Sequence, residues 1–424
     1  MAAKTQEIAA VLCADWGKDP RNRAVYMADV PARTVRRLTE KSWSFVSLLR
    51  AAEPWVGKGP VLLAFDVPLG FPQSYAAALA RQSTIPSPAT FLRVLQEATQ
   101  VPDFYLETSA PGDWRITRPF FRVPGTKGGL RSYENAARQQ GVNLYRTIDA
   151  RTRGKTVFAK SGVPGSVGSA ASVLWQELAP FLVNGRAFKV WPHDGELEVL
   201  LTKDAVIIAE IYPRAAYATA LLDPTDGRWP ALAVAKTKPD IRDSAIAALQ
   251  RSGWVQRLQV KIDDLPNALD NEDDFDACVT ASALLRCILE GLPLSASDLN
   301  VSRVEGGMLG TGTVDLSLPE KIWTARRAPE ERTRLGALPQ GNHDGRASGP
   351  ASRKKRRSQL VTPTREPKAF PCPIPGCARI FVHSRGGWDG HVGSLRLHPQ
   401  WHPELTEEDD RKEQFRGEFP RFFS

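Results

Sequence analysis

The sequence has few cysteines, no long apolar run and no recognisable export signal. No stretch reaches the roughly 18 apolar residues that a membrane helix requires. The first ten residues, MAAKTQEIAA, lack the cationic and apolar segments of a secretory signal. Five cysteines in 424 residues are too few for a disulfide framework. We therefore expect a cytoplasmic protein with no membrane partner.

Positive charge is concentrated in one segment. The chain carries 56 Lys and Arg against 47 Asp and Glu, a net charge of +9. Residues 325–370 hold 12 of the basic and 4 of the acidic residues, a net of +8, so about +1 is left for the remainder. This segment is rich in Pro, Gly and Ser and poor in apolar residues, which predicts a flexible linker.

The linker contains a run of five cations: Arg353, Lys354, Lys355, Arg356 and Arg357. Such a run binds phosphates without sequence preference. It fits either a tether to nucleic acid or a nuclear-localisation signal. In both cases the local cationic density predicts a polyanionic partner, most simply DNA or RNA. In a bacterium, this would place the protein near the nucleoid.

Strands and helices alternate over residues 1–324, which is typical of an α/β domain. Apolar runs predict three buried strands, at residues 8–17, 61–70 and 206–212. Residues 23–30 and 34–39 carry β-branched and alternating residues and could form a meander with the first strand. A helix is expected over 273–288. Residues 72–200 are interpreted as an insertion of helices and loops.

Each buried strand carries one acid: Asp15, Asp66 and Glu210. A carboxylate in an apolar strand costs several kcal/mol to desolvate unless it is paired or bound to a cation. The helix over 273–288 also begins with acids, Glu272, Asp273, Asp274 and Asp276. Asp273 and Asp276 are three residues apart, so both can point from one helical face toward the sheet.

Convergent carboxylates without a nearby Cys or His suit a hard cation, Mg²⁺ or Mn²⁺. Two such ions can hold a phosphodiester for hydrolysis, one by activating the attacking water and the other by stabilising the departing oxygen. The alternative interpretation is a set of unconnected helix caps and salt bridges.

Five blocks of the sequence occur in the order found in a known family: ADWGKDPRNRAVYMAD, AFDVPLGFP, AEIYPRAAYA, EDDFDACVTASALL and EGGMLG. Over roughly residues 8–312 the chain resembles the family catalogued as domain of unknown function 429, a mainly prokaryotic group of predicted nucleases. The resemblance implies a ribonuclease H-like fold, a mixed sheet flanked by helices. It also favours the tether over the nuclear-localisation signal.

The resemblance implies an acidic cluster, with catalytic and metal-binding roles, of Asp15, Asp66, Glu210 and Asp276. Asp273 or Asp274 would be an additional ligand. The pattern Asp273-x-x-Asp276-Ala277 is also similar to the final helix of bacterial junction resolvases, where it supplies metal ligands. His193 could approach the cluster as a proton shuttle, although its setting, VWPHDGEL, is more typical of a turn.

The insertion contains a basic and aromatic stretch over residues 114–133. Its cations are Arg115, Arg118, Arg122, Lys127 and Arg131, and its aromatics are Trp114, Phe120, Phe121 and Tyr133. The pattern fits a loop that binds a nucleic-acid strand by phosphate contacts and base stacking. It fits equally a loop anchored to the core by its aromatics. The later stretch KSGVPGSVGS lacks the Gly-Lys-Ser/Thr of a phosphate-binding loop, so we expect no nucleotide cofactor.

Residues 371–424 contain a cluster of potential zinc ligands: Cys372, Cys377, His391 and His398. Two thiolates and two imidazoles favour tetrahedral Zn²⁺, and the spacing is similar to that of a Cys₂His₂ zinc finger. The cluster departs from that pattern in its long spacing between His391 and His398. We favour His398 as the fourth ligand, with His402 as the alternative.

Together these features predict a metal-dependent nuclease that is tethered to DNA or RNA by the basic linker and the zinc finger. A non-catalytic nucleic-acid-binding protein with the same fold is the alternative.

Overall fold

The computed structural model describes residues 7–82, 90–98, 101, 103–123, 129–162, 165–222, 229–296 and 302–324, residues 410, 413, 414 and 418, and the backbone of 369–371 and 380–382. The chain divides into two compact units, residues 1–332 and 333–424. Several predicted binding residues lie outside the described residues: Lys127, the run 353–357 and the zinc ligands Cys372, Cys377, His391 and His398.

The first unit is built on a mixed sheet. Its main strands are β1 (Ala10–Asp15), β2 (Ala24–Asp29), β3 (Thr34–Arg37), β4 (Val61–Phe65) and β8 (Val206–Ile211). The order is β10-β3-β2-β1-β4-β8-β11, and β7 also pairs with β8. Only the pairs β1–β2 and β2–β3 are antiparallel, and the other pairs of this sheet are parallel. The predicted α/β class and the meander are therefore confirmed.

Short strands complete this and two smaller sheets: β5 (Phe121–Arg122), β6 (Ala159–Ser161), β7 (Lys189–Val190), β9 (Leu232–Ala233), β10 (Lys261–Ile262), β11 (Met308–Leu309) and β12 (Lys321–Ile322). Short 3₁₀ turns are present at Pro20–Asn22, Glu53–Trp55 and Pro111–Asp113. In the second unit, β13 (Ala369–Pro371) pairs antiparallel with β14 (Ile380–Val382).

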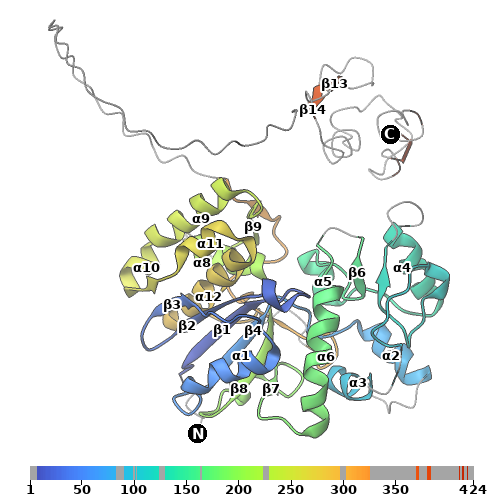
Figure 1. Cartoon of the computed structure of the whole chain (residues 1–424), viewed down its shortest axis with the longest axis horizontal. Helices are drawn as coiled ribbons and strands as arrows, with labels where there is room; N and C mark the ends of the chain where they lie inside the picture. The colour runs from blue at the N-terminus through green and yellow to red at the C-terminus, as the bar shows by residue number, and fades with distance from the viewer. Residues whose placement is uncertain are drawn as a thin grey trace, which may run out of the picture. The chain divides into compact units, whose positions relative to one another are not determined.

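Helices cover both faces of the central sheet, which explains why its strands are apolar runs and not alternating ones. One face packs against α1 (Phe45–Ala52) and α6 (Gly168–Asn184). The other packs against α8 (Pro213–Leu221) and α12 (Glu272–Glu290) (Figure 1). Further helices on this side are α9 (Pro239–Arg251), α10 (Gly253–Leu258) and α11 (Leu265–Asp270).

The residues between β4 and β8 form most of the side of the unit that carries α2 to α6 in Figure 1. Their further helices are α2 (Gln73–Gln82), α3 (Phe91–Ala98), α4 (Gly129–Gln139), α5 (Thr147–Thr152) and α7 (Leu197–Leu200). Edge-to-face rings join this part to α1, where Phe45 packs against Phe181 and Phe188. The expected helices and loops are present over residues 72–200, together with the short strands β5, β6 and β7, of which β7 joins the central sheet.

The loop that follows β4 is held by a close backbone approach. A Cβ atom on Gly70 would lie 2.2 Å from the carbonyl oxygen of Glu305, and one on Gly306 would lie 2.4 Å from that of Leu69. Gly306 also has a φ of +88°, which favours glycine. The EGGMLG motif thus fixes the backbone that leads away from Asp66.

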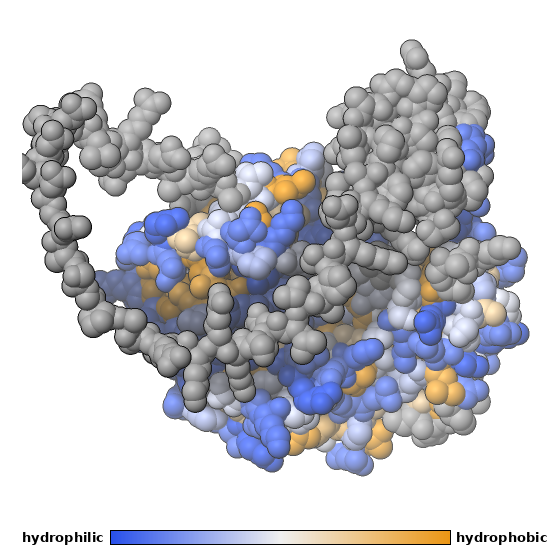
Figure 2. Space-filling model, turned by 45° about the horizontal axis from the view of Figure 1, so that its top comes forward, coloured by the Kyte–Doolittle hydropathy of each residue, from blue (hydrophilic) through white to orange (hydrophobic). Residues whose placement is uncertain are grey.

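The described part of the chain contains no helix that is both long and apolar enough to cross a membrane. Its visible face in Figure 2 is mostly hydrophilic, with smaller hydrophobic areas between.

Candidate functional site

Two of the predicted acids lie side by side because their strands are parallel neighbours. Asp15 is the last residue of β1, and Asp66 directly follows β4. The two strands are in register, with Ala14 opposite Phe65, and the amide of Asp66 donates a hydrogen bond of 3.1 Å to the carbonyl of Ala14. The carboxyl ends of parallel strands are the usual place for ligands in α/β proteins.

The first turns of α12 bring a third acid to these two. One carboxylate oxygen from each of Asp15, Asp66 and Asp276 lies within 4.8 Å of the others. Asp276 is buried, and the other two are half-buried. We call these residues the acidic triad. Three carboxylates at this spacing offer the oxygen donors that Mg²⁺ and Mn²⁺ prefer.

Glu210 lies on the opposite face of the sheet from the triad. It is level with Phe65 on the neighbouring strand, and the side chains of residues in register point the same way. Phe65 belongs to the core under α1 and α6, whereas Ala64 belongs to the core under α12. Asp66, one residue beyond Phe65, therefore points toward α12, and Glu210 points away from it.

Glu210 is bound instead by a buried guanidinium, that of Arg146. Nη1 of Arg146 lies 2.7 Å from Oε2 of Glu210, and Nη2 lies 2.8 Å from Oε1. Asp149 binds the other side of the guanidinium at 2.8 Å, and the amide of Leu69 donates to Glu210 at 2.9 Å. Glu210 was predicted as a metal ligand, and the structure gives its carboxylate these other partners.

The neighbouring acids in the first turn of α12 have different surroundings. Asn271 caps the helix by accepting hydrogen bonds from the amides of Asp273 and Asp274. Asp274 is buried and forms an ion pair of 2.5 Å with Arg37. Asp273 is half-buried, and its charge raises the pKa of both Asp15 and Asp66. Of the two candidates for an additional ligand, Asp273 is therefore the one whose charge acts on the triad.

The triad is a site of concentrated negative charge. Burial raises the pKa of Asp15 well above its usual range, and the charges of Asp66 and Asp273 raise it further. Burial likewise raises the pKa of Asp66 to about 6, opposed by Lys236 and reinforced by Glu210 and Asp273. A bound cation would favour the ionised form of these acids.

A lysine that the sequence did not single out supplies positive charge to the triad. Nζ of Lys236 contacts Oδ2 of Asp276, and the hydroxyl of Tyr217 donates to the other oxygen of the same carboxylate. Lys236 lies between β9 and α9, 40 positions before Asp276 in sequence. No local motif marks it, so only the folded arrangement reveals its role.

A cavity of about 510 Å³ opens beside the triad. Asp66 and Asp276 contribute to its wall, together with Arg146 and Glu210. Further cations line it at Arg153, Lys155, Arg214 and Lys236. The lining comes from β8, α8 and α12 and also from α5 and the loop before α6. The insertion therefore takes part in the site.

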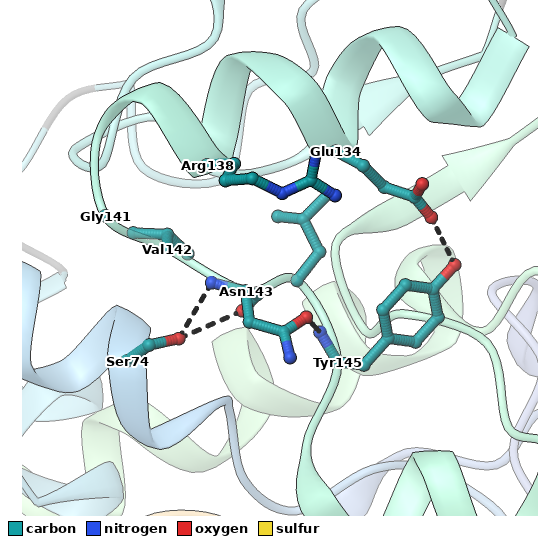
Figure 3. Close-up of a pocket in the computed structure, with 8 residues that line it drawn as sticks. Ser74, Glu134, Arg138, Gly141, Val142, Asn143 and Tyr145 are labelled. Carbon is teal, nitrogen blue, oxygen red and sulfur yellow. Dashed lines mark hydrogen bonds between the residues drawn. The ribbon is translucent and has the colours of Figure 1, made fainter.

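A second cavity, of about 530 Å³, is lined by α2, α4 and residues 141–145. Its polar groups largely satisfy one another (Figure 3). The hydroxyl of Tyr145 donates to Glu134 at 2.8 Å, and the amide of Asn143 donates to the hydroxyl of Ser74 at 2.9 Å. This cavity contains no member of the acidic triad.

The structure buries the aromatics of the predicted strand-binding loop. Trp114, Phe120, Phe121 and Tyr133 are all fully buried. Tyr133 stacks on Phe121, with ring centroids 4.2 Å apart. Base stacking on these rings, one part of that prediction, is therefore wrong, because the rings form the core instead.

The cations of this loop remain at the surface. Arg115, Arg122 and Arg131 are exposed, and Arg118 is half-buried with a hydrogen bond of 2.7 Å to the carbonyl of Glu107. Phosphate binding by these arginines stays a prediction.

His193 connects two loops and does not touch the triad carboxylates in the structure. Its ring nitrogens lie 3.0 Å from the carbonyl oxygen of Arg303 and 2.7 Å from that of Leu69. Burial lowers its pKa. These contacts agree with the turn residue that the sequence favoured over a proton shuttle.

Comparison with known proteins adds no relative, because no family model, curated protein or solved structure matches the chain. The resemblance to the domain of unknown function 429 family therefore stays a prediction that depends on the quoted sequence blocks.

Proposed function

We propose that this chain is a metal-dependent nuclease that hydrolyses phosphodiester bonds of DNA or RNA. The observation that carries the proposal is the acidic triad. Asp15 and Asp66 lie at the carboxyl ends of two parallel strands and Asp276 in the first turns of α12, with one carboxylate oxygen of each within 4.8 Å of the others. The mixed, mostly parallel sheet flanked by helices is compatible with a ribonuclease H-like fold.

The residues present fit a divalent cation, since the triad is a compact set of hard oxygen donors whose own charges repel. A bound Mg²⁺ or Mn²⁺ would supply Lewis-acid stabilisation of the charge that develops on a phosphoryl group. Asp15, Asp66 and Asp276 would hold the metal, and Asp273 would add negative charge beside them. The number of ions, two in our prediction, is a further part of the proposal.

The other residues of the site position the triad and receive the substrate. Lys236 and Tyr217 fix the carboxylate of Asp276. Arg146 binds Glu210 and the carbonyl of Glu305, and so holds β8 against the loop that contains Gly306. The cations of the cavity wall would attract a phosphate to the edge of the triad.

The test is cleavage of labelled single-stranded, duplex, hybrid and branched substrates with Mg²⁺, with Mn²⁺ and with EDTA. We expect metal-dependent cleavage that is lost in Asp15→Asn and Asp66→Asn. Asp204→Asn, which changes an exposed acid outside the cavity, is the matched control and should retain activity. Full activity in both triad variants would contradict the proposed nuclease function.

One observation favours the alternative, a non-catalytic nucleic-acid-binding protein. Lys236 and Tyr217 engage both oxygens of Asp276, so the chain itself partly compensates the triad. A protein of this kind would bind nucleic acid equally well with and without Mg²⁺, and would show no thermal stabilisation by Mn²⁺.

We further propose that residues 325–424 tether the chain to nucleic acid through the basic linker and a structural Zn²⁺ site. The pairing of β13 with β14 supports a finger-like module, because a hairpin precedes the helix in Cys₂His₂ fingers. Cys372 and Cys377 lie in the sequence between these two strands. Zinc content of the full chain, with Cys372→Ala as the comparison, measures this part of the proposal.

A further inference from the structure

The cavity beside the acidic triad combines three chemically distinct walls. Asp66 and Asp276 form the acidic wall, which is shared with the proposed metal site. An apolar wall and a cationic rim complete it. Its volume of about 510 Å³ falls within the range of roughly 300–1,000 Å³ that small-molecule sites occupy.

The apolar wall is formed by side chains from the ends of β8 and β11 and from the segment after β9. They are Ile211, Tyr212, Val234 and Met308. The hydroxyl of Tyr212 donates to the carbonyl of Thr152 at 2.8 Å, so the ring is held in place. An ordered aromatic ring beside aliphatic side chains suits the face of a nucleobase.

Most cations of the cavity already have acidic partners. Arg146 binds Asp149 and Glu210, and Arg214 binds Glu320 at 2.7 Å. Lys236 binds Asp276. These charges hold the site together, and a ligand would have to compete for them.

Arg153 and Lys155 differ from the other cations. Both are exposed, and neither forms an ion pair with any of the residues that the structure describes. They follow α5, on either side of Gly154, whose amide donates to the carbonyl of Asp149 at 2.8 Å. This bond ties the rim to the residue that binds Arg146. Arg153 itself has a φ of +53°, an uncommon conformation for a residue with a side chain.

A substrate that satisfies all three walls must present a base, a phosphate and a second, scissile phosphate together. Paired bases inside a duplex are stacked and cannot offer a face to a cavity unless the nucleotide leaves the stack. An unpaired nucleotide can place its base against Tyr212 and its phosphate on the rim while the next phosphodiester reaches the triad.

We propose that this cavity binds one unpaired nucleotide next to the scissile phosphodiester, with Arg153 and Lys155 holding its phosphate. The substrate class is then single-stranded nucleic acid, or the unpaired end of a duplex. This inference rests on the proposed nuclease function.

The first experiment compares an unstructured single strand with a closed dumbbell duplex that has no ends, using the full chain with Mn²⁺. We expect cleavage of the single strand and at least tenfold slower cleavage of the dumbbell stem. Equal rates on the two substrates would overturn the inference while leaving the nuclease function intact.

The second experiment tests the rim with Arg153→Gln/Lys155→Gln. Its matched control is Lys189→Gln/Lys203→Gln, which removes two exposed lysines that do not line the cavity. Two exposed charge contacts correspond to roughly a 2- to 30-fold change in affinity. We therefore expect KM for the single strand to rise by about that factor with little change in kcat. An unchanged KM, or the same rise in the control, contradicts the assignment.

Binding of a 5′-phosphorylated dinucleotide, measured by calorimetry in the presence of Ca²⁺, separates the two hypotheses. If no substrate is cleaved, the nuclease function fails, and the nucleotide subsite is judged by this measurement alone. Binding that is weakened in the rim variant and kept in the control supports the subsite. Absent binding, or equal binding in all three proteins, overturns it.

Discussion

At the scale of single residues, the direction of one side chain decides which acids can act together. Asp66 directly follows β4 and Glu210 lies within β8, and the family resemblance implied that both belong to one cluster. The pairing of Phe65 with Glu210 places them on opposite faces, because each step along a strand reverses the side-chain direction. Only the register between β4 and β8 contains that information, and no single strand reveals it.

Asp66→Asn should stabilise the metal-free protein. The substitution keeps the size of the side chain and removes a charge that burial and neighbouring acids disfavour. A pKa raised from 3.8 to about 6 corresponds to roughly 1–3 kcal/mol at neutral pH. Urea denaturation in EDTA measures the gain, and thermal melting with Mn²⁺ should show that the metal no longer stabilises the variant. A variant less stable than Asp204→Asn would contradict this expectation.

Lys236→Met should have the opposite effect on stability and should strengthen metal binding. Its ammonium group offsets the charge of the triad, and it contacts an oxygen that a cation would use. We expect the metal-free variant to lose about 1–3 kcal/mol, because its partner Asp276 is left buried without a counter-charge. The affinity for Mn²⁺ should increase several-fold when this competing cation is removed.

Calorimetric titration with Mn²⁺ measures the change for Lys236→Met. Lys238→Met is the matched control, since Lys238 is an exposed lysine two residues further along the chain. Weaker metal binding in Lys236→Met than in the control would show that the lysine holds the site in its binding geometry.

At the scale of elements, the main strands and the presence of an insertion were predictable, whereas the contacts that the insertion makes with the sheet were not. β1, β2, β4 and β8 are apolar runs because helices cover both faces, and of the main strands only the short β3 has several partly exposed residues. The cap residue and the acidic first turn of α12 are local features of the sequence, so this helix was also predictable. By contrast, Arg146 belongs to a loop of the insertion, 64 residues from Glu210, and only tertiary packing brings the two together.

Arg146→Met tests how strongly this ion pair joins the insertion to the sheet. The substitution leaves the carboxylates of Asp149 and Glu210 buried without their partner, which typically costs about 3–5 kcal/mol. Glu210→Gln should cost less, because Asp149 still binds the guanidinium. Chemical denaturation measures both.

Arg214→Met is the comparison for Arg146→Met, since it breaks an exposed pair with Glu320 and should cost about 0–1 kcal/mol. Equal losses in Arg146→Met and Arg214→Met would show that the buried pair does not stabilise the junction between the insertion and the sheet.

At the scale of the whole molecule, the triad should make stability depend on pH. Asp66 has a folded-state pKa of about 6 against an ordinary value of 3.8, so the folded state binds more protons between these values. Its contribution to stability is therefore complete below about pH 4 and is lost as the pH rises through about 6. Asp15 and Asp273 act in the same direction, while Lys236 opposes them.

Thermal melting of the metal-free protein between pH 4 and pH 8 should show this loss, and saturating Mn²⁺ should reverse it above pH 6. Asp66→Asn, which has no proton to lose at this position, should show a flatter profile. A profile as steep as that of the unmodified protein would assign the pH dependence to other groups.

The net charge of the molecule is divided unevenly, and this division predicts how binding responds to salt. Removal of residues 325–424 takes away the five clustered cations 353–357 and leaves the first unit close to neutral. The cut keeps the part of the first unit that the structure describes, because β12 ends at Ile322 and the indole of Trp323 still donates to Ser244 at 2.9 Å. Each phosphate contact contributes about 0.7–0.9 to the slope of log affinity against log salt. The truncated chain 1–324 should therefore bind nucleic acid more weakly, with a slope shallower by roughly 3–5.

Saturating substrate should restore the cleavage rate of the truncated chain, because the triad and its cavity belong wholly to the first unit. A truncated chain that binds Mn²⁺ yet does not cleave at saturation would place residues 325–424 in the active site itself.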